Sequence, residues 1–495
     1  MSAERQAVLA MERVSTGVAR LDYILRGGIP RYSVVFVTGL PGTGKTILAE
    51  QALFANARQG RTGLYLSTLS EPPIKVLRFL QGFTFFDPEL YGSRVLYGDL
   101  GGVLRREGPA ALLGVLERMV QETRPDLVAI DSFRALRDSI TDPLEFRHFT
   151  SDLAVRLSVW EVTSLLIGEY SAQDIHEGPE FAVADGILYL YGTEEAERQR
   201  RYLRVMKMRG TGYYGGDHLF SITSHGIVVY PRMPSLVVGE YAAPAGRISS
   251  AIEGLDEMLG GGLYRSTSTL ISGGTGTGKT TVALSFLIAA AREGMRGLYL
   301  TFEESPQQLA RNVRSLGWDL EEALRRRVIE VLHVAPSELD LDRHAFVVKE
   351  HADRLGAQIV AIDSITAFEA AVPDRAKYQS YLWAITDYLK RRGVTVIMTT
   401  EARNPFALPE VTTRGVSFLA DNVIVLRYAQ VGEEIRRAIA VLKTRGSAHD
   451  RRIRELEIEP RRIAIGAPLG RLSALDMVEE PGAGREPVPE SEGVS

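Results

Sequence analysis

Ser15–Thr46 reads STGVARLDYILRGGIPRYSVVFVTGLPGTGKT, and Ser249–Thr280 reads SSAIEGLDEMLGGGLYRSTSTLISGGTGTGKT, so one pattern occurs twice without a gap. The matching lysines, Lys45 and Lys279, stand 234 residues apart. Solenoid units repeat every ~20–50 residues, so a repeat this long indicates a duplicated domain. The sequence therefore predicts two domains of one kind in a single chain.

The duplication extends through the rest of each half. LVAIDSF at Leu127–Phe133 corresponds to IVAIDSI at Ile359–Ile365, and MKMRG at Met206–Gly210 corresponds to LKTRG at Leu442–Gly446. Between the halves, Pro231–Gly246 holds three Pro and two Gly, which is typical of an extended connection. We expect a first domain over 12–232, a linker over 233–246, a second domain over 247–466 and a disordered acidic tail over 467–495.

Apolar, β-branched runs alternate with helical patterns in both halves. Helices are expected over Ile47–Arg58 and about Phe146–Val162. The expected strands are Val34–Thr38, Gly63–Leu66, Leu127–Asp131 and Ser164–Gly168, followed in the second half by Leu270–Ser272, Gly297–Thr301, Ile359–Asp363 and Thr395–Thr399. Strands that are apolar throughout indicate a parallel sheet buried on both faces. Each half is therefore predicted to be a doubly wound α/β domain, with a mostly parallel sheet and helices on both faces.

Both copies of the repeat end in the motif G-x-x-x-x-G-K-[ST], between a predicted strand and a predicted helix. Its glycines let backbone N–H groups curl around phosphate oxygens, toward which the positive end of the helix points. The alternative is a glycine-rich turn with a chance Lys, and two copies in the same setting argue against it. The pattern predicts a P-loop NTPase that binds ATP through Gly39, Pro41, Gly42, Thr43, Gly44, Lys45 and Thr46 in the first half and Gly273, Thr275, Gly276, Thr277, Gly278, Lys279 and Thr280 in the second.

A nucleotide site also needs oxygen ligands for Mg²⁺. Thr46 and Thr280 offer hydroxyls, while Asp131 and Asp363 each end an apolar run and precede a Ser, as Walker-B acids do. Many strands end in Asp, so the argument depends on the matched spacing of loop and Asp in both halves. We expect Thr46 with Asp131, and Thr280 with Asp363, to hold Mg²⁺ beside ATP.

The halves differ where a catalytic base is expected. After GLYLTF the second half has Glu303 and Glu304, whereas the first half has Leu69 and Ser70, with Glu71 out of register. A carboxylate at a strand end can orient the attacking water, and the alternative is a solvated strand terminus. The sequence therefore predicts Glu303 and Glu304 as catalytic residues and faster hydrolysis in the second half.

Composition excludes several classes of protein. The chain has 58 Lys and Arg against 62 Asp and Glu, and the net −4 resides in Glu479–Ser495, so the body is close to neutral. A neutral body makes nucleic acid an unlikely partner, and Arg198–Arg201 is interpreted as a solvated face. No apolar run approaches the ~18 residues of a membrane span, and MSAERQAVLAMERV has charges inside any signal core. We expect a cytoplasmic protein without membrane contact. Zero Cys excludes disulfides, thiolate metal sites and Cys nucleophiles.

Together these motifs resemble the KaiC family of double-domain RecA-type ATPases, known from the circadian clock of cyanobacteria. The resemblance covers about residues 12–466 and rests on the duplicated Walker elements, TFEESP at Thr301–Pro306, IDSIT at Ile362–Thr366 and the two K-x-R-G turns. It implies tandem RecA-like P-loop domains with Mg²⁺-dependent ATP hydrolysis, acting in signalling or timing-type regulation.

The family also implies an assembly. Its clock protein forms a two-tiered hexamer with ATP between subunits, and the Lys and Arg of K-x-R-G reach the γ-phosphate bound by the neighbour. By resemblance, we expect a homo-hexamer in which Lys207 and Arg209 serve first-half sites and Lys443 and Arg445 serve second-half sites. Such cations stabilise the charge on the transferring phosphoryl group. A regulatory or signalling protein partner is also implied, although the acidic tail differs from the segment with which clock members engage theirs.

Clock members of the family phosphorylate a Ser–Thr pair in their second domain. Here the corresponding stretch reads RGVSFLAD over Arg414–Asp421, so Ser417 is followed by Phe418, and Ala420 stands at a further Thr position. The resemblance makes Ser417 a candidate phosphosite and allows Ser/Thr autokinase activity, at one site and slowly. A small residue before the strand Asn422–Tyr428 is the alternative interpretation.

Two other functions stay open at this point. A RecA-like recombination or repair ATPase would use ATP to bind DNA, and the neutral body and the tandem duplication disfavour it. A signalling scaffold would use nucleotide mainly to hold subunits together, and the missing Glu pair of the first half supports that interpretation for one half.

Overall fold

The computed structural model describes residues 11–68, 73–195, 198–232, 245–335, 340–372, 374–402 and 419–469. The chain divides into two compact units, Met1–Leu236 and Val237–Ser495, called the first and the second unit below. Positions 233–244 of the expected linker and 470–495 of the expected tail lie outside the described residues.

The first unit is built on a nine-stranded sheet with the order β11-β10-β9-β8-β3-β7-β6-β4-β5. The strands from β8 to β5 in this order are parallel, and β9, β10 and β11 extend the sheet antiparallel. A separate antiparallel pair comprises β1 (Arg13–Val14) and β2 (Ile29–Pro30). The sheet strands are β3 (Val34–Gly39), β4 (Gly63–Ser67), β5 (Val95–Asp99), β6 (Leu127–Asp131), β7 (Thr163–Glu169), β8 (Gly186–Glu195), β9 (Arg198–Met208), β10 (Asp217–Thr223) and β11 (Gly226–Tyr230).

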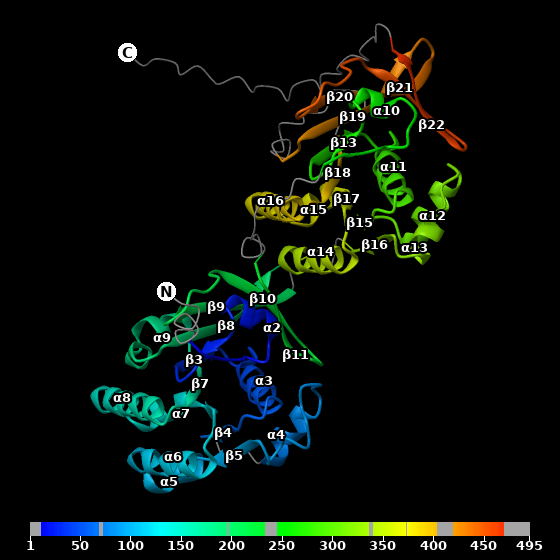
Figure 1. Cartoon of the computed structure of the whole chain (residues 1–495). Coiled ribbons are helices and arrows are strands. Elements are labelled where there is room, and N and C mark those ends of the chain that lie inside the picture. The colour runs from blue at the N-terminus through cyan, green and yellow to red at the C-terminus, as the bar shows by residue number, and fades with distance from the viewer. Residues whose placement is uncertain are drawn as a thin grey trace, which may run out of the picture. The chain divides into compact units, whose positions relative to one another are not determined.

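Helices cover both faces of this sheet (Figure 1). They are α2 (Ala19–Ile24), α3 (Lys45–Ala57), α4 (Pro73–Leu80), α5 (Gly101–Glu107), α6 (Pro109–Thr123), α7 (Phe133–Ser139), α8 (Pro143–Val159) and α9 (Ala172–Glu177), with a 3₁₀ turn at Pro179–Ala182. Because side chains alternate along a strand, Val35 and Val37 of β3 pack with α3, whereas Val34 and Phe36 pack with α6, α7 and α8. This alternation explains why the strand is apolar throughout.

The second unit repeats the architecture, with the strand order β16-β15-β17-β18-β14-β19-β20-β21-β22 and a separate pair β12-β13. Its strands are β12 (Arg247–Ile248), β13 (Leu263–Tyr264), β14 (Ser268–Gly273), β15 (Gly297–Thr301), β16 (Ile329–His333), β17 (Ile359–Asp363), β18 (Thr395–Glu401), β19 (Asn422–Val431), β20 (Glu434–Thr444), β21 (Arg454–Glu459) and β22 (Arg462–Pro468). Its helices are α10 (Leu255–Met258), α11 (Lys279–Arg292), α12 (Pro306–Arg314), α13 (Leu320–Arg325), α14 (Leu341–Leu355), α15 (Ile365–Ala371) and α16 (Arg375–Arg391).

The fold class is confirmed, since both units have mostly parallel sheets with helices on both faces. Two boundaries differ from expectation. Helix α3 begins at Lys45 instead of Ile47, because the glycine loop itself provides its N-cap, Gly44. Strand β22 continues to Pro468, two residues past the expected domain end at 466, because it pairs with β21 as far as Arg454.

Strand direction gives each sheet two distinct edges. In the second unit, Gly273, Asp363 and Glu401 end the parallel strands β14, β17 and β18, so they share the carboxyl edge. The antiparallel strand β20 runs the other way, and its last residue, Thr444, pairs with the first residue of β19, Asn422. The K-x-R-G turn after β20 therefore lies at the amino edge of the parallel strands.

Candidate functional site

In both units the phosphate loop leads from the sheet directly into a helix. Gly44 and Gly278 cap helices α3 and α11 with φ of 97° and 102°, a left-handed backbone that other residues rarely adopt. This conformation turns the free N–H groups of the first helical turn toward the loop. The loop is therefore shaped for an anion.

The predicted loop residues lie together. Gly39 and Gly273 end the strands, and the hydroxyls of Thr43 and Thr277 donate to carbonyls within the loop, Leu40 O at 2.8 Å and Gly274 O at 2.7 Å. Thr275 donates to Glu401, the last residue of the neighbouring strand. Pro41, Gly42 and Gly276 complete the two loops at their turns.

The two loop lysines hold the same position. Lys45 Nζ donates to Leu40 O at 2.9 Å, and Lys279 Nζ donates to Gly274 O at 2.8 Å. Burial lowers the pKa of both amines, and this effect is opposed mainly by the charges of Glu169 for Lys45 and Glu401 for Lys279. Each loop thus surrounds an amine that donates to one of the loop's own carbonyls, and a charged amine of this kind can also donate to a phosphate.

The threonines and aspartates predicted to hold Mg²⁺ are in direct contact. Thr46 Oγ1 donates to Asp131 Oδ2 at 2.7 Å, and Thr280 Oγ1 donates to Asp363 Oδ2 at 2.6 Å. Magnesium prefers oxygen ligands and usually completes its shell with water and phosphate, which this donor set permits. Among the described residues, no group of three or more His, Cys, Asp or Glu side chains is placed to hold a metal ion.

Several hydrogen-bond partners of these groups are not predicted by the sequence motifs. Tyr65 OH donates to Asp131 Oδ2 at 2.9 Å, and Tyr299 and Thr399 both donate to Asp363. Arg437 of β20 contacts its own loop, with Nε 3.2 Å from Gly276 O. The tyrosines stand in the matching GLYL segments of both halves, a signal that could have marked them.

The glutamate pair follows β15 beside the loop. The Glu304 backbone N–H donates to Thr301 Oγ1 at 3.2 Å, and Asn312 of α12 donates to Glu304 Oε1 at 3.2 Å. Burial raises the pKa of the Glu304 carboxyl, and its Oε2 is buried without a hydrogen-bond partner among the described residues. Glu303 is exposed, and its charge helps to raise the pKa of Lys279 against the effect of burial. The first-unit positions 69–71 lie outside the described residues.

The K-x-R-G cations do not reach the loop of their own unit. In the first unit, Lys207 Nζ lies 3.5 Å from Phe181 O, and Arg209 Nη1 lies 3.5 Å from Asp185 Oδ1. In the second unit, Lys443 Nζ donates to Ala420 O at 2.6 Å. All of these contacts lie at the amino edge of the sheet.

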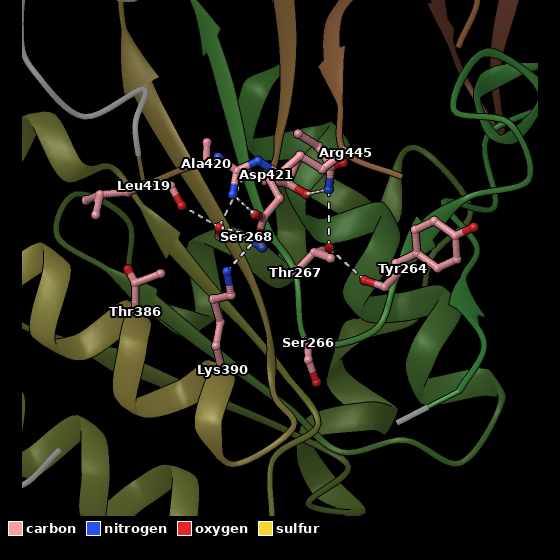
Figure 2. A network of polar contacts seen from close by, with 12 residues as sticks. Tyr264, Ser266, Thr267, Ser268, Thr386, Lys390, Leu419, Ala420, Asp421 and Arg445 are labelled. Carbon is pink, nitrogen blue, oxygen red and sulfur yellow. Dashed lines mark hydrogen bonds and ion pairs between the residues drawn. The ribbon is translucent and has the colours of Figure 1, made fainter. Parts of the chain in front are cut away.

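Arg445 belongs to a polar network around Asp421 (Figure 2). Its Nη1 lies 3.3 Å from Asp421 Oδ1, while Lys390 Nζ and the backbone N of Ser268 contact Oδ2 at 2.7 Å and 2.9 Å. Burial alone would raise the pKa of Asp421, but the Lys390 ammonium and Ser268 lower it overall. The candidate phosphosite Ser417 and its neighbour Phe418 lie outside the described residues.

Comparison with known proteins relates both units to one group. The family model described as "ATPase: KaiC" matches residues 14–233 and 248–470. The circadian clock protein KaiC3 of Synechocystis sp. is 30% identical over 478 residues, covering 94% of this chain and 94% of that protein. The circadian clock oscillator protein KaiC of Picosynechococcus sp. is 30% identical over 476 residues, covering 94% and 91%. That of Synechococcus elongatus is 29% identical over 478 residues, covering 92% and 89%.

No helix in the described part of the chain combines the length and apolar character needed to cross a membrane.

Proposed function

The chain belongs to the KaiC family of ATPases, and we propose that it hydrolyses Mg-ATP at sites completed by a neighbouring copy of the chain, in timing-type regulation. The observation that carries this proposal is the position of Arg445 at the sheet edge opposite the phosphate loop. The relatives named as circadian clock proteins support the regulatory role. The RecA-like DNA-repair alternative is not favoured, because the sequence lacks the excess of Lys and Arg that a DNA-binding protein normally has.

Distance excludes Arg445 from the loop of its own unit. Asp421, which holds Arg445, accepts from the backbone N of Ser268 at the start of β14, whereas the loop begins at Gly273, five residues along the strand. At ~3.3 Å per residue the separation along the strand is about 16 Å, farther than an arginine side chain reaches. If Arg445 acts on a γ-phosphate, that phosphate is not the one at its own unit's loop, and the resemblance to the family assigns it to the second unit of a neighbouring copy. We therefore propose a ring, with the hexamer of the family as its form.

Within one such site, the residues of the second unit divide the work. Lys279 and the loop N–H groups would bind the phosphates, and Thr280 and Asp363 would hold Mg²⁺. When bound, Mg²⁺ supplies charge neutralisation to the phosphates. Glu303 and Glu304 would orient the attacking water and accept its proton, and Arg445 of a neighbouring copy, with Lys443, would stabilise the charge of the transition state.

The first unit has the same loop, Lys45, Thr46 and Asp131, with Lys207 and Arg209 at the corresponding amino edge. Leu69 and Ser70 replace the glutamate pair. We therefore propose that the first unit binds ATP and hydrolyses it more slowly, so that its nucleotide serves mainly to hold the assembly. Binding of nucleotide to the folded, assembled state stabilises that state.

Substitution of the glutamate pair tests where hydrolysis occurs. Glu303→Gln with Glu304→Gln should lower ATP turnover by about 10²–10⁴, because a positioned proton acceptor contributes about that factor, while nucleotide stays bound. The matched control is Glu321→Gln with Glu322→Gln, a neighbouring glutamate pair on α13 of the same unit. Phosphate release by the full chain with Mg-ATP is the measurement. Turnover equal to that of the control would show that the second unit does not carry the hydrolysis.

Autokinase activity is a smaller part of the proposal. Phe418 replaces the second acceptor of the clock members, so we propose slow phosphorylation at Ser417 alone, with hydrolysis to ADP as the main fate of ATP. Mass spectrometry of the full chain after incubation with Mg-ATP should find substoichiometric phosphate on Ser417, which is lost in Ser417→Ala. Stoichiometric phosphate at two sites in Arg414–Asp421 would contradict the proposal.

A further inference from the structure

We propose that Lys390 is a positioning residue of the second unit, which holds the Asp421 carboxylate so that Arg445 can leave it for the nucleotide of a neighbouring copy. The inference deepens the proposed function and rests on the action of Arg445 between copies. It starts from three charged side chains that meet at the amino edge of the sheet (Figure 2).

Asp421 is a buried carboxylate with two cations. Its side chain is 9% exposed, and its Oδ2 accepts from Lys390 Nζ at 2.7 Å and from Ser268 at N (2.9 Å) and Oγ (3.0 Å). Arg445 approaches the other oxygen, Oδ1, at the longer distance of 3.3 Å. The Arg445 side chain is 66% exposed, so its guanidinium sits at the surface and can swing away.

Departure of Arg445 would leave Asp421 paired. A buried carboxylate without a cation is strongly unfavourable, because water cannot replace the lost partner. With Lys390 in place, Oδ2 keeps its ammonium and both Ser268 donors when Arg445 leaves. Lys390 therefore lowers the free-energy cost of releasing Arg445.

In the first unit, the aspartate that pairs with the K-x-R-G arginine has different surroundings. There Asp185 pairs with Arg209 at 3.5 Å and accepts from the backbone N of Val34 at 3.1 Å. Ser158 is the penultimate residue of α8, as Lys390 is of α16, so the first unit has a neutral residue at the position of the lysine. The Asp185 side chain is 30% exposed, so water can solvate it after Arg209 leaves. A second cation is present where the carboxylate is buried.

The inference predicts a specific loss in Lys390→Met. Among the described residues, Arg445 would then be the cation still paired with the buried Asp421 carboxylate, since the nearby Lys443 donates to Ala420 O instead. Its release would cost one charge-assisted hydrogen bond, so kcat should fall roughly tenfold while the KM for ATP changes little. In Lys390→Met with Asp421→Asn, the neutral amide no longer holds Arg445, and kcat should recover to near the wild-type value. Lys390→Arg, which keeps the cation, should retain activity.

A matched control separates positioning from stability. Lys349 pairs with Asp353 at 2.8 Å and is 23% exposed, as Lys390 is, but it lies on α14 away from the turn. Lys349→Met should leave kcat unchanged, and because its partner Asp353 is 32% exposed, it should lower the melting temperature no more than Lys390→Met does. Should Lys390→Met fail to fold, Asp421→Asn alone is the second test, and its kcat should equal or exceed that of the wild type.

Each outcome of these measurements decides a different point. Unchanged kcat in Lys390→Met, together with a low kcat in Arg445→Ala, would overturn the inference and leave the proposed function intact. If Asp421→Asn fails to restore kcat in the Lys390→Met background, Lys390 has a merely structural role, and the inference is overturned as well. Unchanged kcat in Arg445→Ala would instead overturn the proposed function.

Discussion

Glu50 shows how one buried side chain distinguishes the two units. It lies one turn after Thr46 on α3, is 1% exposed, and accepts a hydrogen bond from Tyr97 OH at 2.8 Å, while its Oε1 has no partner among the described residues. Burial raises its pKa to about 8, opposed by Tyr97 and aided by the Asp131 charge. The second unit has the apolar Leu284 at the matching position. The first unit therefore contains a buried carboxyl whose pKa is raised far above its ordinary value.

This carboxyl should make the first unit less stable as the pH rises. Between its ordinary value of 4.5 and about 8, the unfolded chain has released the proton and the folded chain has kept it. The free energy of unfolding should then fall by about 1.4 kcal/mol per pH unit over that window, and level off above it. Glu50→Gln should remove this slope, with a small effect at pH 5 and a clear gain in stability at pH 8.5.

Tryptophan fluorescence can report the first unit alone. Trp160 is its one tryptophan, so in a Trp318→Phe, Trp383→Phe background the fluorescence change on urea unfolding follows that unit. Glu322→Gln, on the exposed face of α13 in the second unit, serves as the control. An identical pH slope with and without Glu50 would show that another group titrates.

At the level of residues, the sequence predicted the loops, the lysines and the Thr–Asp pairs, because their motifs combine fixed spacing with a fixed strand–loop–helix setting. It did not predict Tyr299, Thr399, Lys390 or the pairing of Arg445 with Asp421. These contacts join residues 24 to 64 positions apart, or depend on which edge of the sheet a strand end reaches. Spacing along the chain does not encode such contacts.

At the level of elements, the cap of α12 fixes the end of the strand that carries the glutamates. Ser305 and Gln308 form a capping box directly after Glu303 and Glu304, and Asn312 on the same helix donates to Glu304. The position of α12 therefore determines the position of the Glu304 carboxylate.

Loss of this cap should slow hydrolysis. Ser305→Ala removes one N-cap, at a cost of about 1 kcal/mol, and should lower kcat several-fold with little change in KM, because Glu304 loses its fixed support. Ser171→Ala removes a capping box of the same kind from α9, at a different place in the first unit, and is the control. Steady-state kinetics and a melting curve of each variant test this. If the two variants lose the same stability and have the same kcat, the α12 cap does not contribute to hydrolysis.

The elements were partly predictable. The parallel strands follow from apolar runs such as Ile359–Asp363, which are buried on both faces. The antiparallel extension does not, because β9 and β20 both begin with charged residues, RQRR at Arg198–Arg201 and EIRR at Glu434–Arg437, and the pattern of Arg198–Arg201 predicts a solvated face. Those arginines do lie in a strand, β9, and the extension carries the K-x-R-G turn to the amino edge. The position of the K-x-R-G turn, far from the loop of its own unit, can therefore be inferred only from the sheet topology.

At the level of the whole molecule, the two units share one fold but differ in the charged residues at matching positions. The second unit has Glu303, Glu304 and Lys390, while the first has Leu69, Ser70 and Ser158 at the matching positions. Both units place the loop at one sheet edge and the Arg of K-x-R-G at the other. We therefore propose that ATP turnover is a property of the assembly and not of a single chain.

Complementation between two inactive variants tests whether Arg445 acts on the nucleotide of a neighbouring copy. Arg445→Ala should lower kcat by about 10³–10⁵ as an arginine finger does, and Lys279→Ala should lose nucleotide at its second unit. In mixed rings, an intact loop of the first variant meets an intact arginine of the second. Mixing the two should therefore restore a measurable fraction of the ATP turnover.

The control mixes Arg445→Ala with the double variant Lys279→Ala, Arg445→Ala, where no interface has an intact arginine, so turnover should stay low. Sedimentation of differently labelled variants verifies that the subunits mix. We expect ATP turnover to recover only in the first mixture. No recovery in rings shown to be mixed would mean that Arg445 does not act on the nucleotide of a neighbouring copy.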